Sequence, residues 1–544
     1  MSTSRSQRPP GYTVLRSHAP TRRAQDHTAK MPPELLGKIF DELDPVFVAT
    51  LQRVCKRWLY TIKTNVILQH DAAILRGGLR RGAPEHLPAI KKLEIVAHHQ
   101  KAWATFPACS LNKPFYHAKD SPREVTVKAS ENVMVEMTES GFQFTSFISG
   151  RLRDPARNTP SRIELKDEYG SMDIDASQDL FAWVEYVHRT VHNRACHVME
   201  VHMKDFRRGA HHNLAFTRGT FNYIMPLNSS VISSKLVIAG DFIAVGSAFI
   251  EDRRSSRSLC PLTVFNWKTG HIALDLCDAW LFDFCFLDER HLLFYSRGFH
   301  NDNKARNQDV LLVYDLKTHG SQRTSVSESS TYVCGFSMPD TAMRGTNYPS
   351  LRTSLPLPSS LANSLINIHI SNGHYGPQGM KVFGYVDILF RASSMRRRIA
   401  ACVEGQPRIF RWEEWGPSDT QTTRIVSRER HVNSNFLTGM RAVDLMKDKN
   451  GKLCLYIRDF DRSRIALAKA QGDRNVMEST TVEARTWGHE RITTHLPYLL
   501  RGVSLPRVPG LQDMDARYTQ CTVTEDGVII YDPYGRCPIR VLYL

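Results

Sequence analysis

The feature that most constrains the fold is a short strand-and-turn unit that recurs along the chain from about residue 90. Residues 262–270 alternate apolar and polar side chains and end in a Lys-Thr-Gly turn, and residues 310–318 repeat this design. Residues 408–412, 453–457 and 528–532 resemble further copies. Short β-branched and aromatic runs that are separated by turn residues predict strands, so most of the chain is expected to be all-β.

The spacing of these units indicates how the strands are grouped. Val264 and Val313 are 49 positions apart, and Ile409 follows Val313 by 96 positions, about twice that interval. A period of about 40–50 residues is typical of β-propeller blades, and the two clearest turns resemble a degenerate WD-type repeat. A Gly240-Asp241 turn between two apolar runs further predicts a hairpin. We predict a propeller-like domain at residues 91–544, with an array of β-sandwiches as the alternative.

Residues 31–62 have a different periodicity, which predicts two helices. Pro32 and Pro33 can open a helix because the first turn does not use their missing N–H groups, and Glu34 complements the helix dipole there. Leu35 to Leu43 and then Leu51 to Ile62 place apolar residues at helical spacing. Two such short helices cannot bury all this apolar surface in each other. The surplus must pack on the remaining chain or on a partner.

The same segment resembles an F-box domain. The runs MPPELLGKIFDELDP at residues 31–45 and LQRVCKRW at residues 51–58 match the family pattern of Leu-Pro-x-Glu-Leu-Leu, Ile-Phe-x-x-Leu and Leu-x-x-Val-Cys-Lys-x-Trp. Met31 replaces the opening Leu, a volume-conserving change, and residues 46–48 are more apolar than the family pattern at this point. The F-box followed by a long divergent β domain resembles a broad set of fungal F-box proteins.

The F-box resemblance implies a binding site for the Skp adaptor of cullin-based ubiquitin ligases. The matching positions in residues 32–43 would provide the first stretch of contacts with the adaptor. The matching positions in residues 54–58 would support the second stretch. Carried over by position, the adaptor-binding residues are Pro32, Glu34, Leu35, Leu36, Ile39, Phe40, Leu43, Val54, Cys55 and Trp58. The alternative is that these residues pack internally against the following domain and never meet the adaptor.

Composition and charge bound the remaining possibilities. The formal net charge is +16, and residues 1–30 hold six basic residues against one acid, which predicts a disordered basic tail. The charge elsewhere is dispersed, so nucleic-acid binding is a minor hypothesis. The arginines at 396–398 are expected in a solvated turn. The longest apolar run, residues 236–250, contains Asp241 and is shorter than the about 20 residues of a membrane helix. Eleven cysteines without a C-x-x-C pair favour the cytoplasm or nucleus.

No motif in the sequence predicts a metal, a cofactor or a catalytic site. The histidines and cysteine at 188, 192, 196, 197 and 202 lie in a run that is typical of a strand, where residues four apart are about 13 Å from each other. The acidic run 173–179 lacks the Gly and Glu of a calcium loop and is expected to be a turn. Phosphate-binding and nucleophile motifs are missing from the sequence, and the cysteines are expected to be buried structural thiols.

We therefore predict an α+β multidomain protein without enzymatic activity. The expected parts are a tail at residues 1–30, an F-box at 31–75, a linker at 76–90 and the large β domain at 91–544. The F-box resemblance implies the substrate-receptor subunit of a Skp–cullin–F-box ubiquitin ligase, which would bind the adaptor and through it a cullin. Its protein substrate cannot be named from the sequence. The alternative is a propeller-type interaction scaffold outside any ubiquitin ligase.

Overall fold

The structure is a computed structural model of the chain. It describes residues 27–43, 47–48, 51–77, 87–105, 126–130, 133–138, 141–146, 162–164, 168–191, 194–216, 220–224, 230–250, 258–278, 281–299, 308–318, 323–324, 332–339, 348–353, 364–376, 379–403, 406–426, 436–447, 452–482, 492–505, 519–524, 527–532 and 540–543. Most of the predicted N-terminal tail, residues 1–26, lies outside these ranges.

The chain divides into two compact units, residues 1–69 and 70–544. The first contains the short helices η1 (His27–Lys30), α1 (Pro33–Asp41) and α3 (Lys56–Thr64) and the start of α4 (Val66–Gly77). The second begins with the rest of α4 and α5 (Ala89–Thr105), which pack together through Ala73, Ile74 and Val96. Among the described residues, no helix is both long and apolar enough to cross a membrane.

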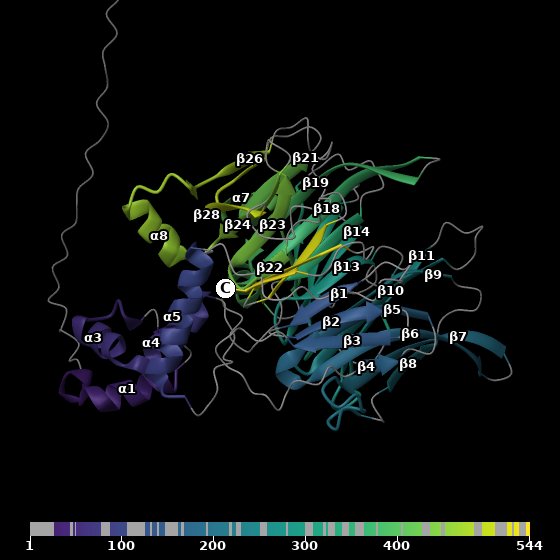
Figure 1. Ribbon diagram of the computed structural model, residues 1–544, viewed down its shortest axis with the longest axis horizontal. Helices are drawn as coiled ribbons and strands as arrows, with labels where there is room; N and C mark the ends of the chain where they lie inside the picture. Colours follow the sequence, from purple (N-terminus) through teal and green to yellow (C-terminus); the bar gives the residue numbers. More distant parts are fainter. Residues whose placement is uncertain are drawn as a thin grey trace, which may run out of the picture. The chain divides into compact units, whose positions relative to one another are not determined.

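Beyond α5 the large unit consists mainly of β-sheets (Figure 1). These sheets have a six-blade propeller arrangement. Blade 1 holds β1 (Val127–Ser130), β2 (Val133–Thr138), β3 (Gly141–Ser146) and β4 (Arg162–Glu164). Blade 2 holds β5 (Glu168–Asp175), β6 (Leu180–Val191), β7 (Arg194–Asp205) and β8 (Thr220–Ile224). Blade 3 holds β9 (Ser230–Ala239), β10 (Phe242–Ile250), β11 (Ser258–Asn266) and β12 (Ile272–Asp278).

The later blades carry insertions. Blade 4 holds β13 (Leu281–Phe286), β14 (His291–Phe299), β15 (Gln308–Asp315), β16 (Cys334–Ser337) and the parallel strand β20 (Arg408–Phe410). Blade 5 holds β17 (Tyr348–Thr353), β18 (Leu365–Gly376), β19 (Gly379–Arg391) and β21 (Thr420–Val426), with α6 (Ala392–Ala400) and α7 (Trp412–Asp419) inserted before β21. Blade 6 holds β22 (Phe436–Thr438), β23 (Arg441–Lys447), β24 (Leu453–Asp459), β28 (Tyr498–Ser504) and β25 (Val476–Met477), with α8 (Arg462–Ala470) inserted.

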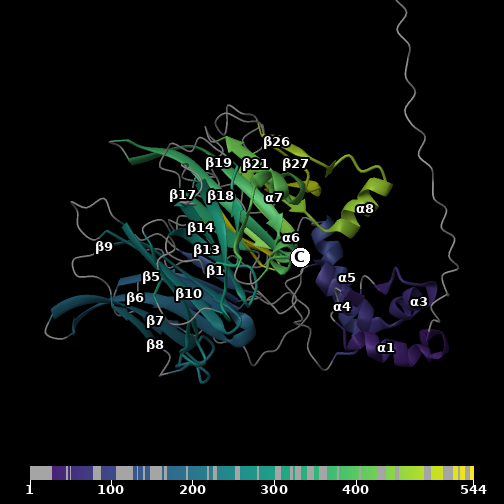
Figure 2. The same cartoon turned by 180° about the vertical axis from the view of Figure 1, so that it is seen from behind.

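A further sheet completes the ring between blade 6 and blade 1. It consists of β29 (Gln520–Thr524), β30 (Gly527–Tyr531) and β31 (Arg540–Tyr543). Successive blades contact each other through their first or second strands, and β29 contacts both β22 and β1. Figure 2 shows these sheets from the opposite side. A small two-stranded sheet, β26 (Thr480–Val482) with β27 (Ile492–Thr494), lies against β21.

The core consists of apolar layers, each between two neighbouring sheets. One layer joins blades 4 and 5 through residues such as Leu311 and Ile368, and another joins blades 2 and 3. Side-chain hydrogen bonds cross the same boundaries. Asp283 on β13 accepts from Lys235 Nζ of blade 3 at 2.6 Å and from the backbone N–H of Leu351 of blade 5 at 2.6 Å. Asp283 therefore links three successive blades.

Four blades share one turn design at the end of their third strand. An Asp or Asn accepts hydrogen bonds from backbone N–H groups two or three residues later, as in an Asx turn. The next residue is buried and apolar, and its N–H donates to the turn between the first and second strands. These pairs are Asp205-Phe206, Asn266-Trp267, Asp315-Leu316 and Asp459-Phe460. The repeat detected in the sequence is therefore a repeated turn that fastens the third strand of each of these blades.

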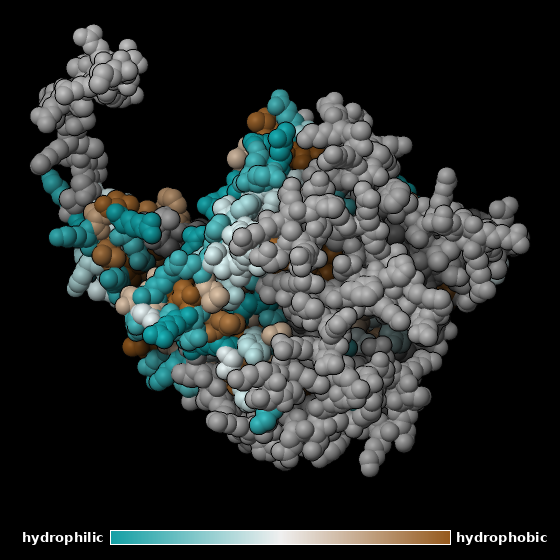
Figure 3. Space-filling view, turned by 90° about the horizontal axis from the view of Figure 1, so that it is seen from above, coloured by the Kyte–Doolittle hydropathy of each residue, from teal (hydrophilic) through white to brown (hydrophobic). Residues whose placement is uncertain are grey.

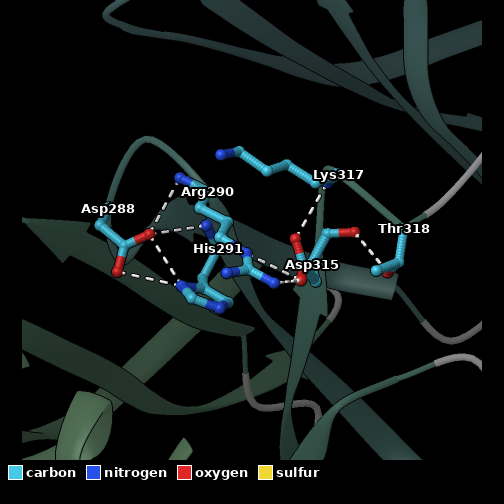
Figure 4. A network of polar contacts seen from close by, with 6 residues as sticks. All are labelled: Asp288, Arg290, His291, Asp315, Lys317 and Thr318. Carbon is cyan, nitrogen blue, oxygen red and sulfur yellow. Dashed lines mark hydrogen bonds and ion pairs between the residues drawn. The ribbon is translucent and has the colours of Figure 1, made fainter. Parts of the chain in front are cut away.

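Figure 4 shows this turn in blade 4. Asp315 accepts from Arg290 Nε at 2.8 Å and from the N–H of Lys317 at 2.9 Å. Asp288 accepts from the N–H of His291 at 2.8 Å and from its Nδ1 at 2.9 Å. Burial by itself would raise the pKa of Asp288, but the hydrogen bond and charge of His291 outweigh burial and lower it. The network joins the β13–β14 turn to the end of β15.

Several sequence predictions are confirmed in this domain. The hairpin at Gly240-Asp241 joins β9 and β10, and Gly240 adopts a left-handed φ of 54°, which glycine accepts without a Cβ clash. Residues 262–266, 310–315, 453–457 and 528–531 lie in strands. The acidic run at 173–179 forms the η3 turn (Ala176–Gln178), in which Asp175 accepts from the N–H of Ser177.

Other predictions are wrong in detail. Residues 408–410 form β20, an extra strand beside blade 4, while the strand equivalent to β15 in blade 5 is β19. The arginines at 396–398 lie in helix α6, where a solvated turn was expected. Residues 338–363 are rich in Ser, Pro, Thr and Asn, which predicts a long exposed loop, but residues 348–353 form β17. Each error arises in or beside blade 5, where local sequence does not show which strand a segment will join.

The N-terminal helix α5 is anchored in the large domain. Trp103, near the end of α5, is 1% exposed and packs in the apolar layer between blade 6 and the β29–β31 sheet. The guanidinium of Arg441 lies over the Trp103 ring, 5.0 Å from its centre. Cation–π stacking and burial hold α5 to the sheets, so α5 is part of the large unit.

Candidate functional site

Helix α1 separates a buried face from an exposed face. Pro32 precedes the helix with φ −54° and ψ 145°, Pro33 occupies its first position, and Glu34 lies in its first turn, as predicted. The helical period then sends Leu36 and Phe40 inward, at 1% and 2% exposure, and Leu35 and Ile39 outward, at 49% and 45%. The predicted apolar stripe is therefore wider than the buried face.

The predicted second helix is interrupted. Cys55 is extended, with φ −155° and ψ 164°, and residues 52–54 form a turn, so the expected continuous helical stripe from Leu51 to Ile62 is wrong. Helix α3 begins at Lys56, and Cys55 Sγ accepts from the N–H of Trp58 at 3.5 Å. Cys55 thus acts as the helix cap, a role that Ser, Thr or Asp usually fills.

Trp58 and Arg57 tie α3 to the start of the folded region. The Trp58 ring meets the Phe40 ring edge-on, with centroids 5.3 Å apart, and Trp58 Nε1 donates to Thr28 Oγ1 at 3.1 Å. Arg57 donates to the carbonyl oxygens of Thr28, at 2.7 Å, and of Met31. Residues 27–30, expected in the disordered tail, therefore form part of the helical unit as η1. Its core is Leu36, Phe40, Val48, Leu51, Ile62 and Leu68.

The helical unit carries a concentration of exposed apolar side chains. Of the eleven large apolar side chains that are exposed among the described residues, six lie between residues 35 and 67. Apolar residues also lie at the surface of the helical part in Figure 3. Six such residues within one small folded unit are typical of a docking surface, whereas single ones elsewhere are ordinary. We call this set the apolar surface; it consists of Leu35, Ile39, Phe47, Val54, Tyr60 and Ile67.

The structure sorts the ten predicted adaptor-binding residues into three groups. Leu36 and Phe40 are buried in the core, and Leu43, Cys55 and Trp58 are half-buried. The exposed residues are Pro32, Glu34, Leu35, Ile39 and Val54. Phe47, Tyr60 and Ile67 were missed, although the unusually apolar residues 46–48 were a signal for Phe47. Tyr60 and Ile67 fall off the periodic stripe, so periodicity could not find them.

The other residues that could carry chemistry form no catalytic or metal-binding arrangement in the described part of the chain. No group of three His, Cys, Asp or Glu there could hold a metal ion. His188 and His197 pair across β6 and β7, whereas His192 lies outside the described residues. His202 stacks on Trp183 and lies 2.8 Å from Glu185. Cys285 is buried, which raises its pKa to about 12, but Cys55, Cys277 and Cys402 are only half-buried.

Comparison with known proteins identifies the helical unit. Residues 29–70 match the family model of the F-box domain. F-box domains bind the Skp1 adaptor within cullin-based ubiquitin ligases. The chain thus combines an F-box domain with a propeller-like domain, a combination typical of non-enzymatic adaptor and receptor proteins. No curated protein sequence matches the chain.

Solved structures resemble the chain only distantly. The tricorn protease is 10% identical with a TM-score of 0.34; the match covers 80% of this chain and 35% of the protease, so this chain spans about a third of it. The N-terminal domain of Nup159 is 10% identical with a TM-score of 0.27, and the match covers 62% of this chain and 73% of that domain. The β-propeller domain of the Trilobed protease from Pyrococcus furiosus is 10% identical with a TM-score of 0.23, and the match covers 53% of this chain and 81% of that domain.

Proposed function

We propose that this protein is the substrate-receptor subunit of a Skp–cullin–F-box ubiquitin ligase of the cytoplasm or nucleus. The apolar surface on a folded F-box domain carries the proposal. Fully burying one Leu or Ile side chain contributes about 1.5–3 kcal/mol, so a few of these residues would account for micromolar or tighter binding of the adaptor. Ile39, at the centre of helix α1, is 45% exposed and belongs to this surface.

The propeller-like domain would hold the protein target. Its turns and inserted helices project from a rigid scaffold, and such connecting segments commonly carry binding residues. The receptor would need no catalytic group, because holding a target lysine near the charged ubiquitin carrier supplies a large effective concentration. The target itself stays undefined.

The test uses exposed residues and spares the core. The full chain is co-expressed with the Skp adaptor, and adaptor capture is compared between the wild type and a Leu35→Asp, Ile39→Asp double variant. A Leu36→Asp change would be unsuitable, since Leu36 is 1% exposed and its loss would unfold the domain. The matched control is Leu467→Asp on α8, where the leucine is 59% exposed.

We expect the double variant to lose adaptor affinity at least about 100-fold, since it removes two apolar contacts and introduces two carboxylates that binding would desolvate. The control should bind like the wild type. Wild-type protein that does not bind the adaptor at micromolar concentration would refute the proposal, and equal binding by the double variant would refute the assigned surface.

A further inference from the structure

Blade 5 breaks the turn design that four other blades share. At the end of its third strand, where those blades have Asp or Asn, stands Arg391. The backbone contact is kept, because the N–H of the next residue, Ala392, donates to the carbonyl oxygen of Ser364 at 3.0 Å. An acceptor is thus replaced by a cation, and of the shared design only this backbone contact is kept. Departures from a repeated local rule tend to mark functional positions.

Arg391 is buried, and although the charges of Asp461 and Asp419 act on it, no carboxylate of the described residues forms an ion pair with it. It is 4% exposed, and its NH2 donates to the carbonyl oxygen of Phe460 in blade 6 at 2.6 Å. Its Nε is buried and makes no hydrogen bond, and among the described residues no carboxylate lies within 4.0 Å. Burial, followed by the charge of Arg462, lowers its pKa to about 10, so it stays protonated at neutral pH. A buried cation in this condition needs a counter-charge.

Two more guanidinium groups lie against the same turn of blade 6. Arg441 is 1% exposed, and its Nε and NH2 make no hydrogen bond; the nearest oxygen of Asp459 is 3.6 Å from Nε. Arg464 donates from NH1 to Asp459 at 2.6 Å, but its buried NH2 has no hydrogen-bond partner. Arg391 contacts Phe460, and the other two arginines contact Asp459, so all three lie against residues 459–460. Figure 2 labels α6 and α8, the helices that follow the ends of β19 and β24.

The nearby carboxylates cannot satisfy these donors. Asp459 accepts from the N–H of Asp461 at 3.0 Å as well as from Arg464. Asp461 accepts from the N–H and the hydroxyl of Ser463, at 2.8 and 2.5 Å. Asp419, whose charge also acts on Arg391, is paired with Arg398. The buried guanidinium groups of Arg391 and Arg441 and the half-buried one of Arg464 therefore face carboxylates that are already engaged, which leaves an excess positive charge and several unused N–H donors. A tetrahedral oxyanion offers the matching charge and several acceptors, and guanidinium groups bind such anions in a bidentate manner.

We propose that Arg391, Arg441 and Arg464 form a binding site for a small free oxyanion of the phosphate or sulfate class, beside the turn from β24 to α8. The burial of Arg391 and Arg441 favours a free ion over a group on a macromolecule. The site is independent of the F-box surface, so its failure would leave the proposed ubiquitin-ligase role untouched.

The direct test is calorimetric titration of the full chain with inorganic phosphate, in chloride buffer of matched ionic strength. We expect saturable binding of one phosphate, weakened on the order of tenfold or more in an Arg391→Met variant. Arg408→Met is the matched control, since Arg408 is a 60% exposed arginine on the neighbouring insertion and should bind phosphate as the wild type does. Selenate soaked into crystals should give an anomalous peak between Arg391 and Arg441.

Absence of saturable phosphate binding by the wild type would overturn the proposal. Water molecules bound to these N–H donors in a crystal structure would then account for the donors' hydrogen bonding. Binding that persists unchanged in Arg391→Met would mean an adventitious ion only and would also overturn it. Should circular dichroism show that this variant does not fold, Arg391→Lys replaces it; this change keeps the charge but removes the forked donors, and weakened phosphate binding is again the supporting result.

Discussion

Asp283 offers the sharpest test of how the blades are held together. Its carboxylate bonds Lys235 of blade 3 and the Leu351 N–H of blade 5, both at 2.6 Å, and Lys235 also donates to the Leu351 carbonyl oxygen at 2.7 Å. The Asp283 side chain is 9% exposed and that of Lys235 is 32% exposed. We predict that Asp283→Ala destabilises the domain, because it removes the counter-charge of Lys235 and the acceptor of the Leu351 N–H.

The magnitude follows from this burial. Removing one partner of a buried ion pair costs about 3–5 kcal/mol. Water can reach part of Lys235 and replace some of the lost bonding, so we take the lower end, about 3 kcal/mol. With an unfolding entropy of about 2.1 cal/mol/K per residue, 1 kcal/mol corresponds to about 1 °C in Tm for a domain of this size. Asp283→Ala should therefore lower Tm by about 3 °C.

The assay is thermal unfolding followed by circular dichroism at pH 7. Asp241→Ala is the control, because Asp241 forms an ion pair with Lys268 in which both side chains are more exposed, 50% and 34%. Exposed pairs contribute about 0–1 kcal/mol, so the control should shift Tm by no more than about 1 °C. If Asp283→Ala unfolds within 1 °C of the control variant, the link between the three blades does not carry the stability assigned to it.

Two further predictions address the core and the response to acid. Trp103→Ala should lower the free energy of unfolding by about 3–5 kcal/mol and Tm by about as many degrees, because it leaves a cavity in the apolar layer beneath Arg441. Ile95→Ala, at a 42% exposed position on the same helix, should change Tm little. Equal shifts of Tm in the two variants would contradict the anchoring of α5. Asp387 is buried, which alone would raise its pKa, but its contacts with His369 and the charge of Arg458 lower it. Its ionised form therefore stabilises the fold above the unfolded pKa of about 3.9, and that contribution is lost as pH falls through the lower folded pKa. The Tm difference between wild type and Asp387→Asn should be fully present at pH 5 and above and should shrink below pH 3. A difference that does not change with pH would contradict this assignment.

The regular parts of the fold could be predicted because local sequence and tertiary structure agree there. The Gly240-Asp241 turn and the apolar runs on either side specify a hairpin without outside help. The start of α1 is equally local, since Pro33 and Glu34 suit a first helical turn wherever it packs.

The remaining parts depend on contacts that the local sequence does not show. Cys55 caps α3 because Trp58 packs against Phe40 and Thr28, so periodicity alone missed the break. Segment 408–410 has the pattern of a third strand but joins β16 as an outer parallel strand. The apolar surface could be predicted only in part. Leu35 and Leu36 are adjacent and of the same type, but they lie 100° apart around the helix, so that Leu35 is exposed and Leu36 is buried.

The anchoring of Trp103 has a consequence for the order of folding. Most sheets consist of strands that follow one another in the chain, so each can form soon after its residues are synthesised. Trp103, by contrast, packs with residues 443–457 and 521–542, which are synthesised more than 300 residues later. The Trp103 indole therefore cannot be buried in this layer until these later sheets have formed. During that interval a nascent chain would present this apolar side chain to chaperones, and α5 would dock only after the sheets between it and its partners have been made.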